Sequence, residues 1–205
     1  SDSLNTAYLE RNKDNAVGMF ILLSWIESMS VDQMEELASE LTEGSANRKL
    51  LEEKIISSKE SEKTSVGKMF LDFSIENGSP DNSVASLSDY VGKGKYVLVD
   101  FWASWCGPCI RETPVIAEVY NKYKGDKFEV VGVAVWEEKR ENTLAAIKQH
   151  GIIWPQILDA KSIPTELYNI EGIPHIILFG PDGTILARGL RGKSLKNKIA
   201  EVMHK

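Results

Sequence analysis

One stretch of the sequence, YVLVDFWASWCGPCIRE at residues 96–112, constrains the fold most, because it joins a strand pattern to a helix pattern through two cysteines. The β-branched and aromatic run Tyr96–Phe101 predicts a buried strand, and the apolar spacing after it predicts a helix over Cys106–Lys124. A disulfide between Cys106 and Cys109 would close so short a loop that it adds little stability. The pair therefore points to chemistry rather than to structural cross-linking.

The position of the cysteines at the start of a helix favours reactivity at one of them. Unpaired backbone N–H groups and the positive end of the helix dipole favour a thiolate there, so we expect a lowered pKa for Cys106. Cys109 would lie one turn further along, less exposed, where it can attack the mixed disulfide that Cys106 forms with a substrate. Pro108 suits a first turn because its missing N–H is not needed, and Gly107 removes bulk beside the incoming sulfur. These residues fit thiol–disulfide exchange.

The chain after residue 64 alternates between strand and helix patterns. We expect further strands at Phe128–Val135, Gln156–Leu158, His175–Phe179 and Ile185–Arg188, and further helices at Asn142–His150 and from a Ser194 cap onward. A Gly-Pro-Asp-Gly sequence at residues 180–183 is a strong turn signal between the last two strands. This order predicts an α/β fold with a central mixed sheet and helices on both faces.

Residues 1–57 show helical patterns and almost no strand signal. We expect three or four short helices there, with caps at Asp14 or Asn15, at a Ser30–Gln33 capping box and at Ser45. The polar stretch Ser57–Ser65 indicates a linker. The expected organisation is therefore a small all-helical segment with its linker at residues 1–64, followed by an α/β domain at residues 65–205.

The first expected helix, Ala16–Met29, is apolar on most of its faces, so we expect Phe20, Ile21 and Trp25 to be buried against something. No face of the helical segment gathers titratable side chains. We therefore expect this segment to provide packing and no chemistry.

Composition argues against several classes of protein. Apolar residues make up 42% and charged residues 26% of the chain, which is typical of a globular protein. The net charge is −6 and no long block of Lys or Arg is present, so we expect no nucleic-acid partner. The apolar run Ala16–Ile26 is too short to span a bilayer, and the missing initiator Met at Ser1 indicates a processed or trimmed N-terminus. A redox pair works in reducing and oxidising compartments alike, so the cysteines do not fix the compartment.

Three motifs in order resemble the thioredoxin superfamily. The sequence FWASWCGPC at residues 101–109 is similar to its active-site stretch, and Pro114 matches its helix-kinking proline. Gly172-Ile173-Pro174 matches its cis-proline loop. The resemblance covers roughly Val66–Lys205.

A closer resemblance is to the extracytoplasmic thiol–disulfide oxidoreductases of that superfamily, the TlpA-like branch described as AhpC-TSA or Redoxin proteins. The shared segments are Val66–Met69, Asp72-Phe73, Leu87–Tyr90, Arg111–Pro114 and an extra α/β unit at about Glu137–Leu158. The resemblance implies a thioredoxin-like fold with that extra unit inserted. The preceding helical segment is similar to the tail of a domain found in some of these proteins.

The resemblance also implies roles for single residues. Cys106 would attack and Cys109 would resolve, while Pro174 would lie opposite the pair and Ile173 would offer backbone groups to an extended substrate. Trp105 would form part of the rim on which a partner docks, beside Gly107 and Pro108.

The implied partners are proteins that carry disulfides, together with an external electron donor such as a membrane thiol reductase. The implied location is the periplasm or another space outside the cytoplasm. Membrane contact would arise only through an N-terminal anchor that is absent from this sequence. Neither a cofactor nor a metal is expected.

Two acids could move the proton of Cys109. Asp100 ends an otherwise apolar strand, so burial should raise its pKa and let it exchange a proton with the thiol. Glu112, one turn after Cys109, matches an acid of the TlpA-like branch. Members of that branch often carry a non-acid at the position of Asp100, so the sequence leaves open which acid acts.

Alternative functions share the same cysteines. A peroxidase of the peroxiredoxin type needs Thr or Ser three residues before its reactive cysteine, where this chain has Ala103. A metal-binding or delivery module could use Cys106, Cys109 and His175, although related copper-delivery proteins separate their cysteines by three residues rather than two. The Gly-Pro pair between the cysteines favours a reductant of protein disulfides.

Overall fold

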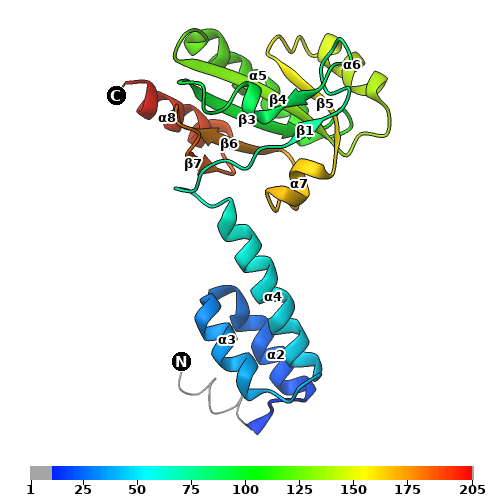
Figure 1. Cartoon of the computed structure of the whole chain (residues 1–205), viewed down its shortest axis with the longest axis vertical. Coiled ribbons are helices and arrows are strands. Elements are labelled where there is room, and N and C mark those ends of the chain that lie inside the picture. Colours follow the sequence, from blue (N-terminus) through cyan, green and yellow to red (C-terminus); the bar gives the residue numbers. More distant parts are fainter. Residues whose placement is uncertain (1–10, 205) are drawn as a thin grey trace. The chain divides into compact units, whose positions relative to one another are not determined.

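The structure is a computed structural model that describes residues 11–204. The chain divides after Lys63 into two compact units, one helical and one built around a sheet (Figure 1). Within residues 11–204, none of the helices combines the length and apolarity needed to cross a membrane.

The helical unit contains α2 (Ala16–Trp25), a 3₁₀ turn η1 (Ile26–Ser28), α3 (Val31–Glu40) and α4 (Ala46–Lys63). The side chain of Asn15 caps α2 by accepting the N–H groups of Val17 and Gly18. Ser30 and Gln33 form the expected capping box of α3, and Ser45 accepts the N–H of Arg48 at the start of α4. The core of this unit consists of Leu22, Ile26, Met34, Ala38, Leu41, Leu51 and Ile55.

Two expectations about this unit are wrong. The stretch Ser57–Ser65 is not an irregular linker, because α4 continues through most of it, to Lys63. Its Lys and Glu residues are good helix formers, so its polarity reflects a solvated helix rather than a loop. Phe20 is 75% exposed, and Ile21 and Trp25 are half-buried, because a helix that is apolar all round can turn only one face to the core.

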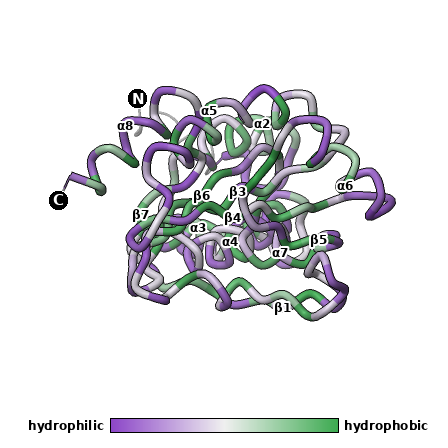
Figure 2. Tube along the Cα trace, turned by 90° about the horizontal axis from the view of Figure 1, so that it is seen from above, coloured by the Kyte–Doolittle hydropathy of each residue, from purple (hydrophilic) through white to green (hydrophobic). Residues whose placement is uncertain are grey.

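The second unit has the expected mixed sheet, in the order β5-β4-β3-β6-β7. Its strands are β3 (Tyr96–Trp102), β4 (Phe128–Val135), β5 (Gln156–Lys161), β6 (His175–Phe179) and β7 (Ile185–Arg188). β3, β4 and β5 run parallel, and β6 pairs antiparallel with β3 and β7. In Figure 2 the traces of β3, β4 and β6 are largely hydrophobic, as expected for strands that are buried on both faces.

Short elements and helices complete this unit. They are the hairpin β1 (Ser74–Ile75) and β2 (Ala85–Ser86), the 3₁₀ turn η2 (Leu87–Asp89), and the helices α5 (Gly107–Tyr123), α6 (Arg140–Gln149), α7 (Ile163–Leu167) and α8 (Gly192–Met203). The extra α/β unit expected from the resemblance is α6 with β5, and β5 is three residues longer than the predicted Gln156–Leu158. α8 begins at Gly192 rather than after Ser194, whose Oγ accepts the Arg191 N–H from inside the first turn.

Two apolar clusters lie on opposite faces of the sheet. Along β3, Leu98 and Trp102 belong to the cluster that contains residues of α5 and α8, whereas Val97, Val99 and Phe101 belong to the other. Side chains alternate between the faces of a strand, so Asp100 points to the same face as Leu98 and Trp102. This alternation places the acid on the face that α5 covers.

Candidate active site

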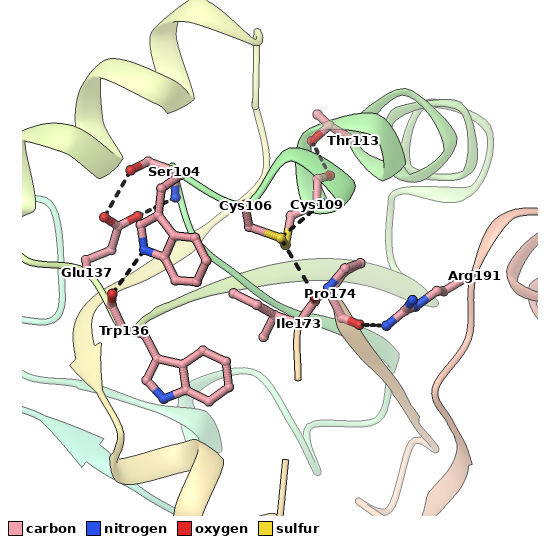
Figure 3. The surroundings of a disulfide bond; sticks show 10 residues. Ser104, Cys106, Cys109, Thr113, Trp136, Glu137, Ile173, Pro174 and Arg191 are labelled. Carbon is pink, nitrogen blue, oxygen red and sulfur yellow. Dashed lines mark hydrogen bonds between the residues drawn. A yellow bond between two sulfur atoms is a disulfide. The ribbon is translucent and has the colours of Figure 1, made fainter. Parts of the chain in front are cut away.

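The cysteine pair lies where β3 gives way to α5 (Figure 3). Cys106 is the N-cap of α5, and Pro108 stands in its first turn. Cys106 and Cys109 form a disulfide with an S–S distance of 2.02 Å, and the Cys109 N–H points to Cys106 Sγ at 3.2 Å. The structure is therefore that of the oxidised chain.

Both cysteines are nearly buried in the disulfide form, and they differ in their position on α5. Cys106 is 4% exposed and Cys109 is 1% exposed, whereas Gly107 and Pro108 between them are exposed. Unpaired N–H groups at the start of α5 stabilise negative charge on a sulfur at the N-cap. Position and electrostatics both favour Cys106 as the sulfur that a partner meets first.

The loop before β6 faces this pair. The Ile173–Pro174 peptide bond is cis, as the resemblance implied, and the Ile173 carbonyl oxygen lies 3.7 Å from Cys106 Sγ. Pairing of β3 with β6 sets His175 opposite Phe101, so Pro174 lies at the end of the sheet where β3 approaches the cysteines. Figure 3 shows Ile173 and Pro174 opposite the sulfurs.

Asp100 is a buried acid on the face of the sheet covered by α5. It is 4% exposed, and its Oδ1 atom has no hydrogen-bond partner among residues 11–204. Burial, followed by the negative charge of Glu112, raises the pKa of Asp100 from 3.8 to about 8. This value lies near that of a thiol, about 8.5.

Glu112 has a different environment. It is half-buried, and its carboxylate accepts the N–H of Gly192 at 2.6 Å, at the first residue of α8. The neighbouring Arg191 guanidinium donates to the Pro174 carbonyl. The segment Arg191-Gly192, at the start of α8, thus contacts both α5 and the cis-proline loop. Sequence reasoning missed Arg191, since only the fold brings it to Pro174.

The His175 ring lies beside arginines. Its Nε2 atom is 3.5 Å from the Arg188 guanidinium. Burial, followed by the positive charges of Arg188 and Arg191, lowers the pKa of His175 to about 4, so it is neutral at pH 7. Over the described range, the His, Cys, Asp and Glu side chains form no group of three placed to hold a metal ion.

Trp105 forms a rim next to Cys106. It is 59% exposed, and its Nε1–H donates to the Trp136 carbonyl at 3.1 Å. The Glu137 carboxylate accepts the backbone N–H of Ser104 and also its hydroxyl, the latter at 3.0 Å. Trp102, in contrast, is a core residue that donates to Gln156 Oε1. Sequence reasoning missed Trp136 and Glu137, which reach the cysteine loop from the end of β4.

Comparison with known proteins places this site in a family context. The model of the AhpC/TSA family matches residues 66–188. The chain is 34% identical over 121 residues to the thiol-disulfide oxidoreductase ResA of Bacillus subtilis, which covers 58% of this chain and 64% of ResA. ResA of Geobacillus kaustophilus is 35% identical over 99 residues, which covers 48% of this chain and 55% of that protein. The chain thus spans less than two thirds of either relative.

Solved structures are similar as well. The thioredoxin domain of a thiol-disulfide oxidoreductase from Bacteroides vulgatus matches with a TM-score of 0.60 and 33% identity, over 67% of this chain and 97% of that one. A thiol:disulfide interchange protein from Bacteroides sp. matches with a TM-score of 0.61 and 35% identity, over 70% of this chain and 93% of that one. Both matches cover nearly the whole of the solved chain.

Proposed function

Since this chain belongs to the AhpC/TSA family, as a TlpA/ResA-like member of the thioredoxin superfamily, we propose that it is a thiol–disulfide oxidoreductase that reduces protein disulfides. One observation carries the proposal: a Cys106–Cys109 disulfide sits at the N-terminus of α5, facing a cis-proline loop. A backbone of this kind presents one sulfur to a partner and keeps the second within bonding distance of the first.

The first step joins the substrate to Cys106. In the reduced chain the Cys106 thiolate attacks one sulfur of the client disulfide, forms a mixed disulfide, and releases the other client sulfur as a thiolate. The backbone of Ile173 and the ring of Pro174 support the client segment beside the sulfur. Trp105, Gly107 and Pro108 form the exposed surface on which that segment docks.

The second step releases the client. Cys109 loses its proton to Asp100, whose pKa of about 8 makes the transfer nearly neutral in free energy. The Cys109 thiolate then attacks Cys106 Sγ, closes the disulfide and expels the second client thiolate. The client gains two electrons and, from solvent or Asp100, two protons. Glu112 acts as a positioning residue, because its carboxylate holds the start of α8 against α5.

Partners and location follow from this chemistry and from the family. Each turnover leaves the chain oxidised, so an external electron donor must reduce it, and we assign that role to a membrane thiol reductase. We place the protein in the periplasm or elsewhere outside the cytoplasm. We also propose that the helical unit and the α/β unit are separate domains.

Reduction of insulin by dithiothreitol tests the proposal. The intact chain should accelerate the turbidity that free insulin B chain produces, and Cys106→Ser should reduce the rate to that of dithiothreitol alone. Cys109→Ser should accumulate a mixed disulfide with the client, visible as a mass increase that dithiothreitol removes. Equal acceleration by the intact chain and by Cys106→Ser would show that the cysteine pair is not the active centre.

The same chain can be tested as a peroxidase. Ala103 offers no hydroxyl to orient a peroxide, so we expect slow consumption of hydrogen peroxide by the reduced chain. Consumption faster than insulin reduction under the same conditions would favour the peroxidase instead.

A further inference from the structure

A hollow of about 420 Å³ lies beside the loop that leads into Cys106. Two of its lining residues lie just before Cys106 in the chain, and the other three follow the end of β4. The lining residues are Ser104, Trp105, Trp136, Glu138 and Asn142. An extended chain advances only about 3.3 Å per residue, so a client side chain within a few positions of the reacting cysteine can enter this hollow.

The two indoles of the hollow are fixed at their polar edges. Trp105 Nε1–H donates to the Trp136 carbonyl, and Trp136 Nε1–H donates to Thr165 Oγ1, both at 3.1 Å. Trp136 has a φ of 55°, a left-handed conformation that a bulky residue seldom adopts, and its N–H bonds to the Lys161 carbonyl. Because its ring N–H is already used, the exposed Trp105 indole can offer a ligand only its electron-rich π-face.

Two acids lie at the hollow. Glu138 is exposed and lines it, and Glu137 binds Ser104 at its edge. The exposed Lys139 follows Glu138 in the chain but is not among the lining residues. Arg140, although close in sequence, donates to the Asn77 and Ser79 carbonyls and pairs with Asp159 at 3.1 Å. This half-buried arginine is therefore committed elsewhere, and the acids at the hollow are not paired with it.

We propose that this hollow binds a lysine or arginine side chain near the disulfide of a protein substrate. The exposed face of the Trp105 indole attracts a cation, and the Glu138 carboxylate adds charge complementarity that an aromatic or aliphatic side chain would not use. The inference rests on the proposed function, since it names the substrate class of the same active site: proteins whose reactive cysteine has a basic neighbour.

Three series of peptides test the inference. Each peptide carries one cysteine as a mixed disulfide with glutathione, and one variable residue, Lys, norleucine or Glu, scanned over three positions on either side of the cysteine. The reduced intact chain is mixed with each peptide, and release of the peptide thiol is timed. At one or two positions we expect the Lys peptide to react about threefold to tenfold faster than the norleucine peptide, and the Glu peptide to react slowest.

Charge reversal locates the effect. Glu138→Lys should invert the order, so that the Glu peptide reacts faster than the Lys peptide. Glu141→Lys makes the same change of net charge in the first turn of α6, outside the hollow, and should keep the order of the intact chain.

Three results would overturn the inference: equal rates for Lys and norleucine peptides, an unchanged order in Glu138→Lys, or an equal inversion in Glu141→Lys, which would indicate a long-range charge effect. Failure of the intact chain to reduce insulin would instead overturn the proposed function. The two failures are therefore distinguishable.

Discussion

The helical unit and the α/β unit differ in buried charge. Both carry ion pairs at the surface, including Lys196–Glu118 and Lys198–Glu201 in the α/β unit, but among residues 11–204 the buried charged side chain belongs to the α/β unit. In the helical unit, ion pairs lie at the surface, and Glu27 of the Lys54–Glu27 pair is 77% exposed. Other pairs there are Lys13–Glu40, Arg48–Glu52, Lys59–Glu35 and Lys63–Glu60. In the α/β unit, Asp100 is 4% exposed and its Oδ1 atom lacks a hydrogen-bond partner among residues 11–204.

This difference separates residues that serve chemistry from residues that serve solubility. A buried carboxyl without a full set of hydrogen bonds costs stability, and such a cost is commonly retained at active sites. Exposed ion pairs contribute little to stability. We therefore expect changes in the helical unit to affect stability alone, and changes at Asp100 to affect both stability and rate.

Among the variants that test this comparison, Asp100→Asn should show the largest effect on the rate. Without a carboxylate to accept the proton of Cys109, insulin reduction should slow by about 100-fold. The rate of the intact chain should also change near pH 8, the pKa of Asp100, and the variant should lose this feature. Asp126→Asn, in an exposed loop, is the matched control and should keep both the rate and the pH profile. An Asp100→Asn variant with the control's rate would remove Asp100 from the mechanism.

Leu51→Ala tests the helical unit. Leu51 is fully buried there, so we expect a loss of about 2–5 kcal/mol in unfolding free energy. Insulin reduction should stay within about twofold, because Leu51 belongs to the core of the helical unit and shares no packing partner with the cysteine site. Ile116→Ala, a similar deletion in α5, should lower both stability and rate. If Leu51→Ala slowed the reaction as much as Ile116→Ala, the separation between the units would be wrong.

The stability of the oxidised chain should depend on pH through Asp100. Its pKa is raised from 3.8 to about 8, so between these values the folded state binds more protons than the unfolded state. Stability therefore falls as pH rises through this window, and Asp100→Asn should abolish that fall. The variant should match the intact chain below pH 4 and exceed it by several kcal/mol above pH 8, since each unit of pKa shift corresponds to about 1.4 kcal/mol. Urea unfolding across the window measures the difference, and a constant difference would contradict the assignment.

Glu27→Gln should show the smallest effect. The Lys54–Glu27 pair is exposed on the glutamate side, so its loss should cost less than about 0.5 kcal/mol and leave the rate unchanged. Urea unfolding of the variant beside the intact chain checks this value. A loss above about 2 kcal/mol in unfolding free energy would contradict the statement that exposed ion pairs of the helical unit contribute little to stability.

Local patterns predicted most of the fold. The apolar run of β3 was visible in the sequence, so burial of Asp100, the acid within that run, could be predicted together with the strand. The capping box at Ser30 likewise marked the start of α3. The error at Ser57–Ser65 arose because polar composition is shared by linkers and by solvated helices. Residue type alone does not separate these two cases.

The surroundings of the cysteines were less predictable. Arg191 reaches Pro174, and Glu137 reaches Ser104, only after the strands have assembled. Both contacts join segments far apart in the chain, and neither carries a local signal. The roles assigned to Cys106, Cys109, Ile173 and Pro174 remain predictions that kinetics must test.

Redox equilibration of the purified chain tests most directly the central claim, that Cys106 and Cys109 form a reversible disulfide. The chain is incubated in buffers with a graded ratio of reduced to oxidised dithiothreitol, alkylated and weighed by mass spectrometry. We predict one transition between a form with two alkylated cysteines and a form with none, with a slope of about 30 mV per tenfold change in ratio, as a two-electron couple requires. A chain that stays doubly alkylated or wholly unmodified at every ratio, or that passes through a stable singly alkylated form, would contradict a reversible Cys106–Cys109 pair.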